Sequence, residues 1–399
     1  MQALAEQSLQ KNYRITSIDF LRGIIMIIMA LDHTRDFFHS QAFSDDPLNL
    51  NTTTPLLFFT RWITHYCAPL FVFLSGTSIY LQSIRKNKKQ LSIFLIKRGL
   101  WLILIELLVM SFAFTFDIEY HIFILQTIWA IGISMILLGL ILWLPFNIIL
   151  ATGLIIVFGH NLLDFAEVKS NGGFGFGWSL LHHQNSFHLW GNHKLMVFYP
   201  FLPWTGLMLL GYCMGKLFRN EVDENYRRKV LTLLGIGIIL SFILLRASNV
   251  YGDPVPWTVQ KTSFFTFLSF INTHKYPPSL LFMCMTIGPA MLFLAWFSHI
   301  RNRITEVFTV YGRVPFLYYV LHFYVLHVVC MFLFLARGHT FNEGLNTTGS
   351  PFKFVNAGEG YNLGVVYIIW IALIIILYPV CKWFSNYKQT HKKWWLSYL

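Results

Sequence analysis

The stretch SIDFLRGIIMIIMALDHTRDFF, residues 17–38, decides how the chain is interpreted. Its centre, residues 24–31, is entirely apolar, as in a helix that crosses a membrane. The same stretch also carries six ionisable residues: Asp19, Arg22, Asp32, His33, Arg35 and Asp36. Ionisable groups at membrane depth are rare and usually mark a functional site. The stretch therefore predicts a transmembrane helix that also carries the chemistry.

The spacing of Arg22 and His33 places both on one face of this helix. They are eleven residues apart, which separates them by about 16 Å along the axis and about 20° around it. Both must face protein or a water-filled cavity, because lipid would penalise each of them. With the N-terminus inside, Arg22 would lie near the cytoplasmic face and His33 beyond the midplane. This arrangement suits a large anionic donor that enters from the cytoplasm, although Arg22, three residues after the capping residue Asp19, could also be only a topological anchor.

Composition predicts an all-α polytopic membrane protein. The 399 residues are 55% hydrophobic and 12% charged, with a mean hydropathy of +0.55, whereas globular proteins carry roughly twice that charged fraction. We expect about ten helices around a cavity that joins the two faces, in a transmembrane domain at 18–381 between a cytoplasmic segment at 1–17 and a basic cytoplasmic tail at 382–399. The expected spans are 18–40, 62–82, 91–113, 121–143, 147–163, 197–217, 230–248, 278–297, 314–336 and 362–381.

Lys and Arg are concentrated in the segments that lie on one side in this arrangement, which predicts cytoplasmic N- and C-termini. The net charge of +12 therefore follows from topology and does not indicate nucleic acid. The five cysteines fall in or at the ends of apolar segments, without disulfide or metal-ligand spacing.

Three long loops are expected on the outer side, at 41–61, 164–196 and 249–277. The second is rich in glycine, aromatic and polar residues, which suits a lid or substrate mouth, or else a flexible surface loop. Its histidines, at positions 182, 183, 188 and 193, have no fixed ligand spacing and no nearby cysteine, so no metal is expected.

The surroundings of His33 leave alternatives open. Asp36 lies one turn further on and either orients the imidazole or pairs with Arg35. Arg61 and His65, at i,i+4 on the outer side, are expected near the place where His33 and His39 emerge. The small residues Ser75, Gly76 and Ser78 permit either close helix packing or room for a thin pantetheine chain. His322 and His327 are five residues apart, so at most one of them can line the cavity.

RITSIDFLRGIIMIIMALDH (residues 14–33) resembles the first-span signature of the acyltransferase-3 superfamily, with an arginine and a histidine at the ends of an eleven-residue interval. Four later blocks resemble a bacterial branch related to heparan-α-glucosaminide N-acetyltransferase: FFTRWITHYCAPLFVFLSGTSIYL (58–81), YPFLPWTGLMLLGYCMG (199–215), KYPPSLLFMCMTIGP (275–289) and YGRVPFLYYVLHFYVLH (311–327). The resemblance runs from about Arg14 to Lys382.

The resemblance implies acetyl-CoA on the cytoplasmic side as acyl donor and an amine or hydroxyl, usually of a sugar, on the far side as acceptor. His33 would be the general base or a transient acyl carrier, and comparison with the lysosomal branch points to His39 as the alternative. The expected catalytic residues are His33, Asp32, His39 and Asp36; the expected donor ligands are Arg22, Arg98 and Arg313; and the expected acceptor contacts are Arg35, Arg61, His65, Lys275 and Tyr276.

The expected function is therefore acetyl transfer across a membrane, in a bacterial inner membrane. The alternative is a proton-coupled transporter or flippase of an anionic or glycan substrate, although neither internal repeats nor paired broken helices are visible in the sequence. The sequence leaves the acceptor, the choice between N- and O-transfer and the oligomeric state open, with a homodimer among the alternatives.

Overall fold

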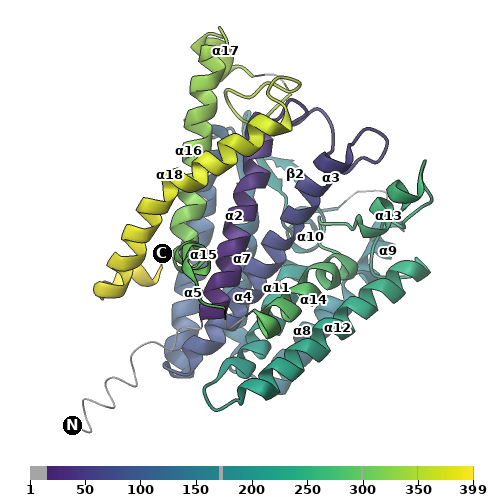
Figure 1. The fold of residues 1–399 in the computed structure, drawn as a ribbon, viewed down its shortest axis with the longest axis vertical. Coiled ribbons are helices and arrows are strands. Elements are labelled where there is room, and N and C mark those ends of the chain that lie inside the picture. Colours follow the sequence, from purple (N-terminus) through teal and green to yellow (C-terminus); the bar gives the residue numbers. More distant parts are fainter. Residues whose placement is uncertain (1–15, 170–173, 298–299, 348, 399) are drawn as a thin grey trace.

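The structure, a computed structural model, describes residues 16–169, 174–297, 300–347 and 349–398. Nearly all of the cytoplasmic segment expected at 1–17 lies outside these residues, as do residues 170–173 of the second outer loop. The described chain is mostly helical, with one small sheet (Figure 1).

The elements follow one another in this order. The first part comprises α2 (Thr16–Phe38), α3 (Pro55–Trp62), the 3-10 turn η1 (Ile63–Tyr66), α4 (Cys67–Ser83), α5 (Lys88–Ile105), the π-helical turn η2 (Glu106–Met110), α6 (Ser111–Thr115), β1 (Ile122–Leu125), α7 (Thr127–Ile141), α8 (Phe146–Gly159), α9 (Leu162–Lys169), α10 (Phe176–Leu181), β2 (Asn185–His188) and β3 (Lys194–Val197). The second part comprises α11 (Phe201–Met214), η3 (Gly215–Phe218), α12 (Glu224–Ser248), α13 (Ser263–Ile271), α14 (Leu280–Trp296), α15 (Arg303–Arg313), α16 (Pro315–Ala336), α17 (Phe341–Leu345), α18 (Leu363–Thr390) and η4 (Trp394–Ser397).

The sheet corrects the all-helical expectation. Its order is β1-β3-β2, with β1 parallel to β3 and β2 antiparallel to it, and Ile122 lies opposite Lys194. The span expected as one helix over 121–143 therefore begins as a strand, and its helix starts only at Thr127. A short apolar run such as IFIL fits a strand as well as a helix, and pairing with the distant segment of Lys194 decides in favour of the strand.

Each of the ten expected spans contains helix, but only some helices meet the length and hydropathy of a membrane span. Among the described residues these are four, at Pro55–Ser83, Glu224–Ser248, Pro315–Ala336 and Leu363–Thr390, or five if α8 and α9, bent by 41°, are counted as one span. The central helix α2, with its charged residues, is not among them. The last helix continues to Thr390, so the basic tail expected from 382 begins as part of α18.

Helix α2 lies in the middle of the fold, with α16 and α18 on one side of it and α14 and α12 on the other (Figure 1). Its closest neighbour is α15, against which it crosses at Gly23 and Gly312. A Cβ atom on Gly23 would overlap the backbone oxygen of Phe308, and one on Gly312 would overlap that of Asp19. The two backbones can approach this closely only because both positions are glycine.

Helices α4 and α11 make a second close crossing. A Cβ atom on Gly76 would overlap the backbone oxygen of Met208, and the Thr77 hydroxyl donates a hydrogen bond to the Gly211 carbonyl at 3.0 Å. The close helix packing considered for the small residues of LSGTS is therefore present. Gly76 and Thr77 pack against α11, whereas Ser75 and Ser78 line a cavity on the other face of α4.

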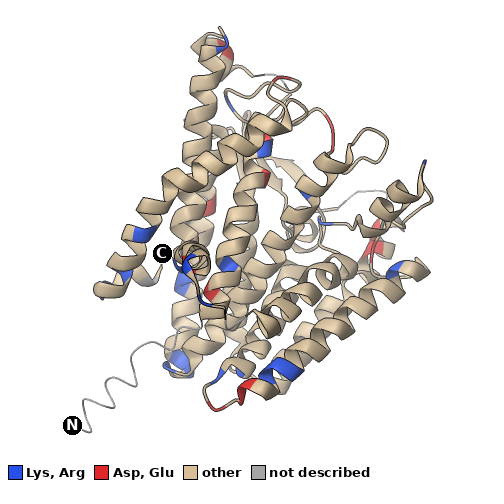
Figure 2. Ribbon diagram, in the orientation of Figure 1, with Lys and Arg blue, Asp and Glu red and all other residues tan. Residues whose placement is uncertain are grey.

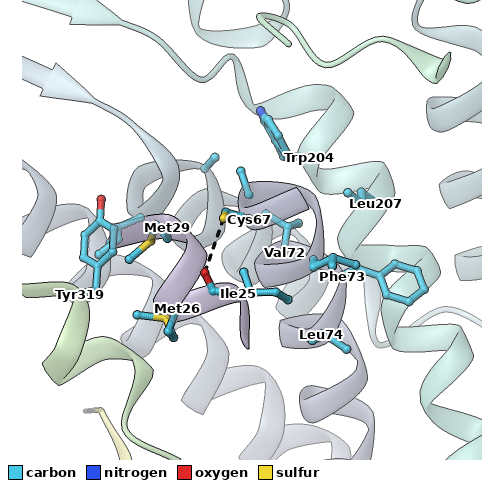
Figure 3. Close-up of a cluster of buried hydrophobic side chains, with 14 of the residues drawn as sticks. Ile25, Met26, Met29, Cys67, Val72, Phe73, Leu74, Trp204, Leu207 and Tyr319 are labelled. Atoms are coloured by element: carbon cyan, nitrogen blue, oxygen red, sulfur yellow. Dashed lines mark hydrogen bonds between the residues drawn. The ribbon is translucent and has the colours of Figure 1, made fainter. Parts of the chain in front are cut away.

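Lys and Arg positions are frequent along the chain toward the end of the fold where α2 and α12 begin and α15 lies (Figure 2). The distribution agrees with the asymmetry seen in the sequence. Apolar side chains fill the space between the central helices. In Figure 3, Ile25 of α2 approaches Cys67 of α4, whose thiol donates to the Ile25 carbonyl at 3.5 Å, and Met26 and Met29 lie on the side of Tyr319 of α16.

Candidate active site

Two cavities lie along α2, one near each end of the helix. The inner cavity, about 260 Å³, is reached by Arg22, and the outer cavity, about 250 Å³, is reached by His33. Met26 lines the inner cavity and Met29 the outer one. The face predicted from the eleven-residue spacing thus faces open space at both ends.

The two cavities share part of their lining. Phe71 of α4, Thr127 at the start of α7 and Tyr319 of α16 line both of them. Tyr319 lies beside Met26 and Met29 in the packed centre of the molecule (Figure 3). These three residues therefore lie between the inner and the outer cavity.

The inner cavity brings together the three arginines expected to hold the donor. Arg22 comes from α2, Arg98 from α5 and Arg313 from the end of α15, and the glycine crossing of α2 with α15 brings Arg22 and Arg313 to the same wall. Lys388 of α18 adds a fourth cation that sequence reasoning assigned only to the tail. No carboxylate is among the described residues that line this cavity.

The Arg22 guanidinium is held on two sides. It donates to the Ser78 hydroxyl at 2.8 Å and forms an ion pair with Asp19 at 3.3 Å. Ser78 is on the polar side of α4, next to Ser75 on the same cavity wall. The capping role suggested for Asp19 therefore does not exclude a ligand role for Arg22, because the guanidinium still lines the cavity.

The outer cavity contains a compact charged cluster. Arg61 of α3 forms an ion pair with Asp32, and Arg35 pairs with Asp32 at 3.1 Å and with Asp36 at 2.6 Å. Of the two readings of Asp36, pairing with Arg35 is therefore the one observed. Arg35 itself is buried behind the two carboxylates and does not line the cavity, in contrast to its expected contact with an acceptor.

The His33 imidazole contacts a second histidine instead of a carboxylate. Its Nδ1 lies 2.7 Å from Nε2 of His322, and the ring centroid of Phe323 is 4.1 Å from that of His33. His322 is fully buried and lines neither cavity. His327, five residues further along α16, lies instead between the carbonyl oxygens of Ala113 and Lys353.

Lys275 and Tyr276, in the loop before α14, reach the outer cavity as expected. The Lys275 ammonium lies 5.0 Å from the centroid of the Tyr276 ring. Burial by itself raises the pKa of Tyr276, but the positive charges of Lys275 and Arg61 outweigh it and hold that pKa below its usual value. Tyr276 is therefore a stronger hydrogen-bond donor than an ordinary phenol.

Two expected site residues lie away from the cavity. His65 is buried against the Phe282 ring, because the 3-10 turn η1 after Arg61 rotates successive residues by about 120° and breaks the shared face expected for an α-helix. His39 pairs through its backbone with Tyr361 and accepts a hydrogen bond from the Gln41 amide at 3.3 Å. The described outer cavity is lined by neither histidine.

The second outer loop contributes to the cavity through its last residues. Met196 of β3 and the following Phe198 line it, whereas the four loop histidines do not. His182 and His183 instead contact Glu167 at 2.9 and 3.1 Å. Oxygen and nitrogen atoms of Asp164, Glu167 and His182 lie close enough together to hold a cation, but this group lies outside both cavities and the sequence gave no reason to expect a metal there.

Aromatic side chains form most of the remaining outer wall. They are Phe37, Phe43, Phe71, Phe114, Phe198, Tyr199, Tyr276, Tyr319, Phe323 and Phe352. Flat ring faces beside a few polar groups are suited to a ligand with both apolar faces and hydroxyl or amine groups. The outer cavity therefore combines apolar ring faces with a few charged and polar groups.

Residues 14–251 match the family described as heparan-alpha-glucosaminide N-acetyltransferase, catalytic. A search of curated proteins finds no match. The family match begins where the expected resemblance begins, and the quoted blocks at 275–289 and 311–327 lie beyond it. Because it spans more than half of the 399 residues, the chain belongs to this family.

Proposed function

We propose that this member of the heparan-alpha-glucosaminide N-acetyltransferase family transfers an acetyl group from acetyl-CoA in the inner cavity to an amine or hydroxyl of a sugar in the outer cavity. The observation that carries the proposal is the position of Arg22 and His33 on one face of α2, each in its own cavity, with Phe71, Thr127 and Tyr319 lining both cavities. A single extended donor can therefore be held at one end and react at the other.

The inner cavity has the charge that coenzyme A requires. Guanidinium groups bind phosphate through paired hydrogen bonds, and three arginines and a lysine converge here. The serine-lined wall of α4, with Ser75 and Ser78, leaves room for the narrow pantetheine arm on its way to the junction at Thr127. The thioester would then lie between Tyr319 and His33.

His33 is the general base of the proposed reaction. Its Nε2 takes the proton from the acceptor amine or hydroxyl while the acceptor nitrogen or oxygen bonds to the thioester carbonyl carbon. The carbon–sulfur bond then breaks, and the same Nε2 returns the proton to the departing thiolate. The products are the acetylated sugar and free coenzyme A, and His33 ends as it began.

The acceptor would be held by the polar groups that face the outer cavity. Tyr276 and Lys275 offer hydrogen-bond donors, and the Asp32 and Asp36 carboxylates offer acceptors. The charges of Asp32 and Asp36 are balanced by Arg61 and Arg35, so the site has no large excess of either sign. This balance favours a neutral or singly charged sugar.

The proposed placement is a multi-pass protein of the bacterial inner membrane, with ten membrane-crossing or membrane-embedded segments and cytoplasmic termini. Supporting this, Lys and Arg gather at the end of the fold that holds the inner cavity (Figure 2). The donor cavity would then open to the cytoplasm, where acetyl-CoA is made.

Calorimetric titration of the detergent-purified protein with coenzyme A tests the donor assignment. We expect saturable binding to the wild type that is weakened in Arg98→Ala and Arg313→Ala. Arg228→Ala is a matched control, because Arg228 stacks on Trp296 at 3.8 Å and does not line the cavity. Equal affinity of all four proteins for coenzyme A would contradict a donor site in the inner cavity.

Incubation with acetyl-CoA and a set of simple sugars, including glucosamine and methyl glucoside, tests the transfer itself. We expect release of free thiol in step with an acetylated sugar that mass spectrometry detects. Binding of coenzyme A without acetylation of any sugar in the set would contradict a sugar acceptor and would favour the alternative function, a transporter or flippase.

A further inference from the structure

The His33 imidazole is fixed by a chain of two hydrogen bonds. His33 Nδ1 lies 2.7 Å from His322 Nε2, and His322 Nδ1 lies 3.0 Å from the backbone oxygen of Tyr318. One of the two readings of Asp36 in the sequence placed that carboxylate where His322 lies. The chain of contacts therefore ends on a carbonyl group and not on a charge.

The carbonyl at the end of this chain determines where the protons lie. A carbonyl oxygen only accepts hydrogen bonds, so His322 must carry its proton on Nδ1. A neutral imidazole with a proton on Nδ1 has its lone pair on Nε2. His322 Nε2 then accepts a hydrogen bond from Nδ1–H of His33, which leaves the lone pair of His33 on Nε2.

We propose that His322 is a positioning residue that holds His33 in the tautomer protonated on Nδ1, so that Nε2 is the base offered to the outer cavity. The proposal rests on the proposed function for its kinetic consequence, but the tautomer itself does not depend on that function. His322 acts through His33, because it is fully buried and lines neither cavity.

None of the charged groups near His33 takes the place of His322 as the hydrogen-bond partner of Nδ1. Around His33, the charged groups that line the cavity are Asp32 and Asp36 on its own helix, Arg61 from α3 and Lys275 from the loop before α14. The oxygens of Asp32 already accept from Arg35 and Arg61, so its carboxylate is engaged. Among the described contacts of the His33 ring nitrogens, His322 is the hydrogen-bond partner.

The contact also fixes the direction of the ring. Phe323 packs against both imidazoles, with ring centroids 4.1 Å from His33 and 4.4 Å from His322. With Nδ1 held by His322, the opposite ring nitrogen is directed away from α16. When Nε2 takes the acceptor proton, the resulting imidazolium still donates Nδ1–H to His322, which stabilises its charge until Nε2 protonates the thiolate.

The first test compares substitutions of His322 in the purified protein. His322→Leu removes the hydrogen-bond acceptor, and we expect kcat to fall by about 10- to 100-fold, as when the partner that orients a metal-bound histidine is removed, while the KM for acetyl-CoA is retained. His322→Gln keeps an acceptor oxygen at similar reach, so it should recover most of that loss. Equal activity of His322→Leu and wild type would overturn the proposal.

His327→Leu is the matched control. His327 is a buried histidine of the same helix, but its ring contacts the Ala113 and Lys353 carbonyls and not His33. We expect a lower melting temperature with kcat close to wild type. An equal fall of kcat in His322→Leu and His327→Leu would show that the loss comes from general damage to α16, which would also overturn the proposal.

Nitrogen NMR of protein labelled at histidine measures the tautomer without any turnover. We expect the His33 signal, assigned by its loss in His33→Gln, to show a protonated Nδ1 and an unprotonated Nε2, and His322→Leu to give a mixture of tautomers. A protonated Nε2 in the wild type would overturn the proposal. If instead the tautomer is as expected but no acetyl transfer is detected, the proposed function fails and the positioning role of His322 stands.

Discussion

The inner and outer cavities lie along one helix but arrange their charges differently. The inner cavity is lined by Arg22, Arg98, Arg313 and Lys388, with no carboxylate among its described lining residues. In the outer cavity, Arg61 pairs with Asp32, and Asp36 pairs with the buried Arg35. The first arrangement favours a polyanion, whereas the second cancels most of its own charge.

The origin of the charged residues differs in the same way. The four inner cations come from four different helices, α2, α5, α15 and α18, which must be brought together by tertiary packing. Three of the outer charged groups, Asp32, Arg35 and Asp36, lie within two turns of α2 itself. Under the proposed function, the inner cavity would supply affinity for the charged donor, and the outer cavity would orient the base and the acceptor.

Loss of the base should have the largest effect and should separate the two cavities most clearly. For His33→Gln we expect kcat to fall by about 10²- to 10⁴-fold, the usual contribution of a general base, while coenzyme A binding in the inner cavity is retained. Steady-state kinetics measures kcat and calorimetry measures coenzyme A binding, and together they test whether the two cavities have separate roles.

His39→Ala is the companion variant for His33→Gln. His39 lies outside the described outer cavity, so its replacement should leave kcat near the wild-type value. An inactive His39→Ala beside an active His33→Gln would mean that the base is the histidine further along the chain.

Removal of an inner cation should affect donor binding alone. Arg22→Ala should weaken coenzyme A binding by about 10- to 100-fold, as expected for loss of a charge-assisted hydrogen bond, and Arg22→Lys should recover only part of this. Lys275→Ala in the outer cavity is the control for loss of positive charge. Comparable losses of coenzyme A affinity in Arg22→Ala and Lys275→Ala would erase the distinction between the cavities.

Disturbing the glycine crossing of α2 and α15 should change ligand binding in the inner cavity more than in the outer cavity. Gly312→Ala places a Cβ against the Asp19 backbone oxygen, and we expect it to lower the free energy of unfolding by about 1–3 kcal/mol and to weaken coenzyme A binding. Thermal unfolding measures the first effect. Gly237→Ala is the control, because no atom lies within 4 Å of the added Cβ, and a drop of the same size there would contradict the packing argument.

The smallest effect is expected from a single acceptor contact. Tyr276→Phe removes a phenol whose pKa is lowered by Lys275 and Arg61, despite the opposing effect of burial. We expect the KM for the sugar to rise by about 3- to 10-fold, the value of one hydrogen bond, with the KM for acetyl-CoA unchanged. If only the KM for acetyl-CoA changed, Tyr276 would contact the acyl donor and not the sugar.

The sequence predicted the parts of this site that depend on helical periodicity. Arg22 and His33 are on one face because eleven residues make about three turns, and both do reach cavities. The gathering of Arg98 and Arg313 beside Arg22 followed from their expected side of the membrane and is present.

Features that depend on tertiary contacts could not be read from the chain. His322 is 289 residues from His33, and nothing in its own segment distinguishes it from His327. Lys388 reaches the inner cavity only because α18 extends beyond its apolar run. The position expected for His65 was wrong because a 3-10 turn interrupts the helix. The strand at Ile122–Leu125 forms by pairing with Lys194–Val197, which lies about seventy residues further along the chain, well beyond the length of a βαβ unit.

Transfer between compartments tests the central claim most directly. The protein would be reconstituted in one orientation into vesicles with the acceptor sugar sealed inside and acetyl-CoA added outside, at the face of the inner cavity. The account predicts acetylated sugar inside the vesicles and free coenzyme A outside, formed about 10²- to 10⁴-fold more slowly with His33→Gln. Acetylated sugar formed only when the donor and the sugar are on the same side would contradict a transfer that runs along α2 from one cavity to the other.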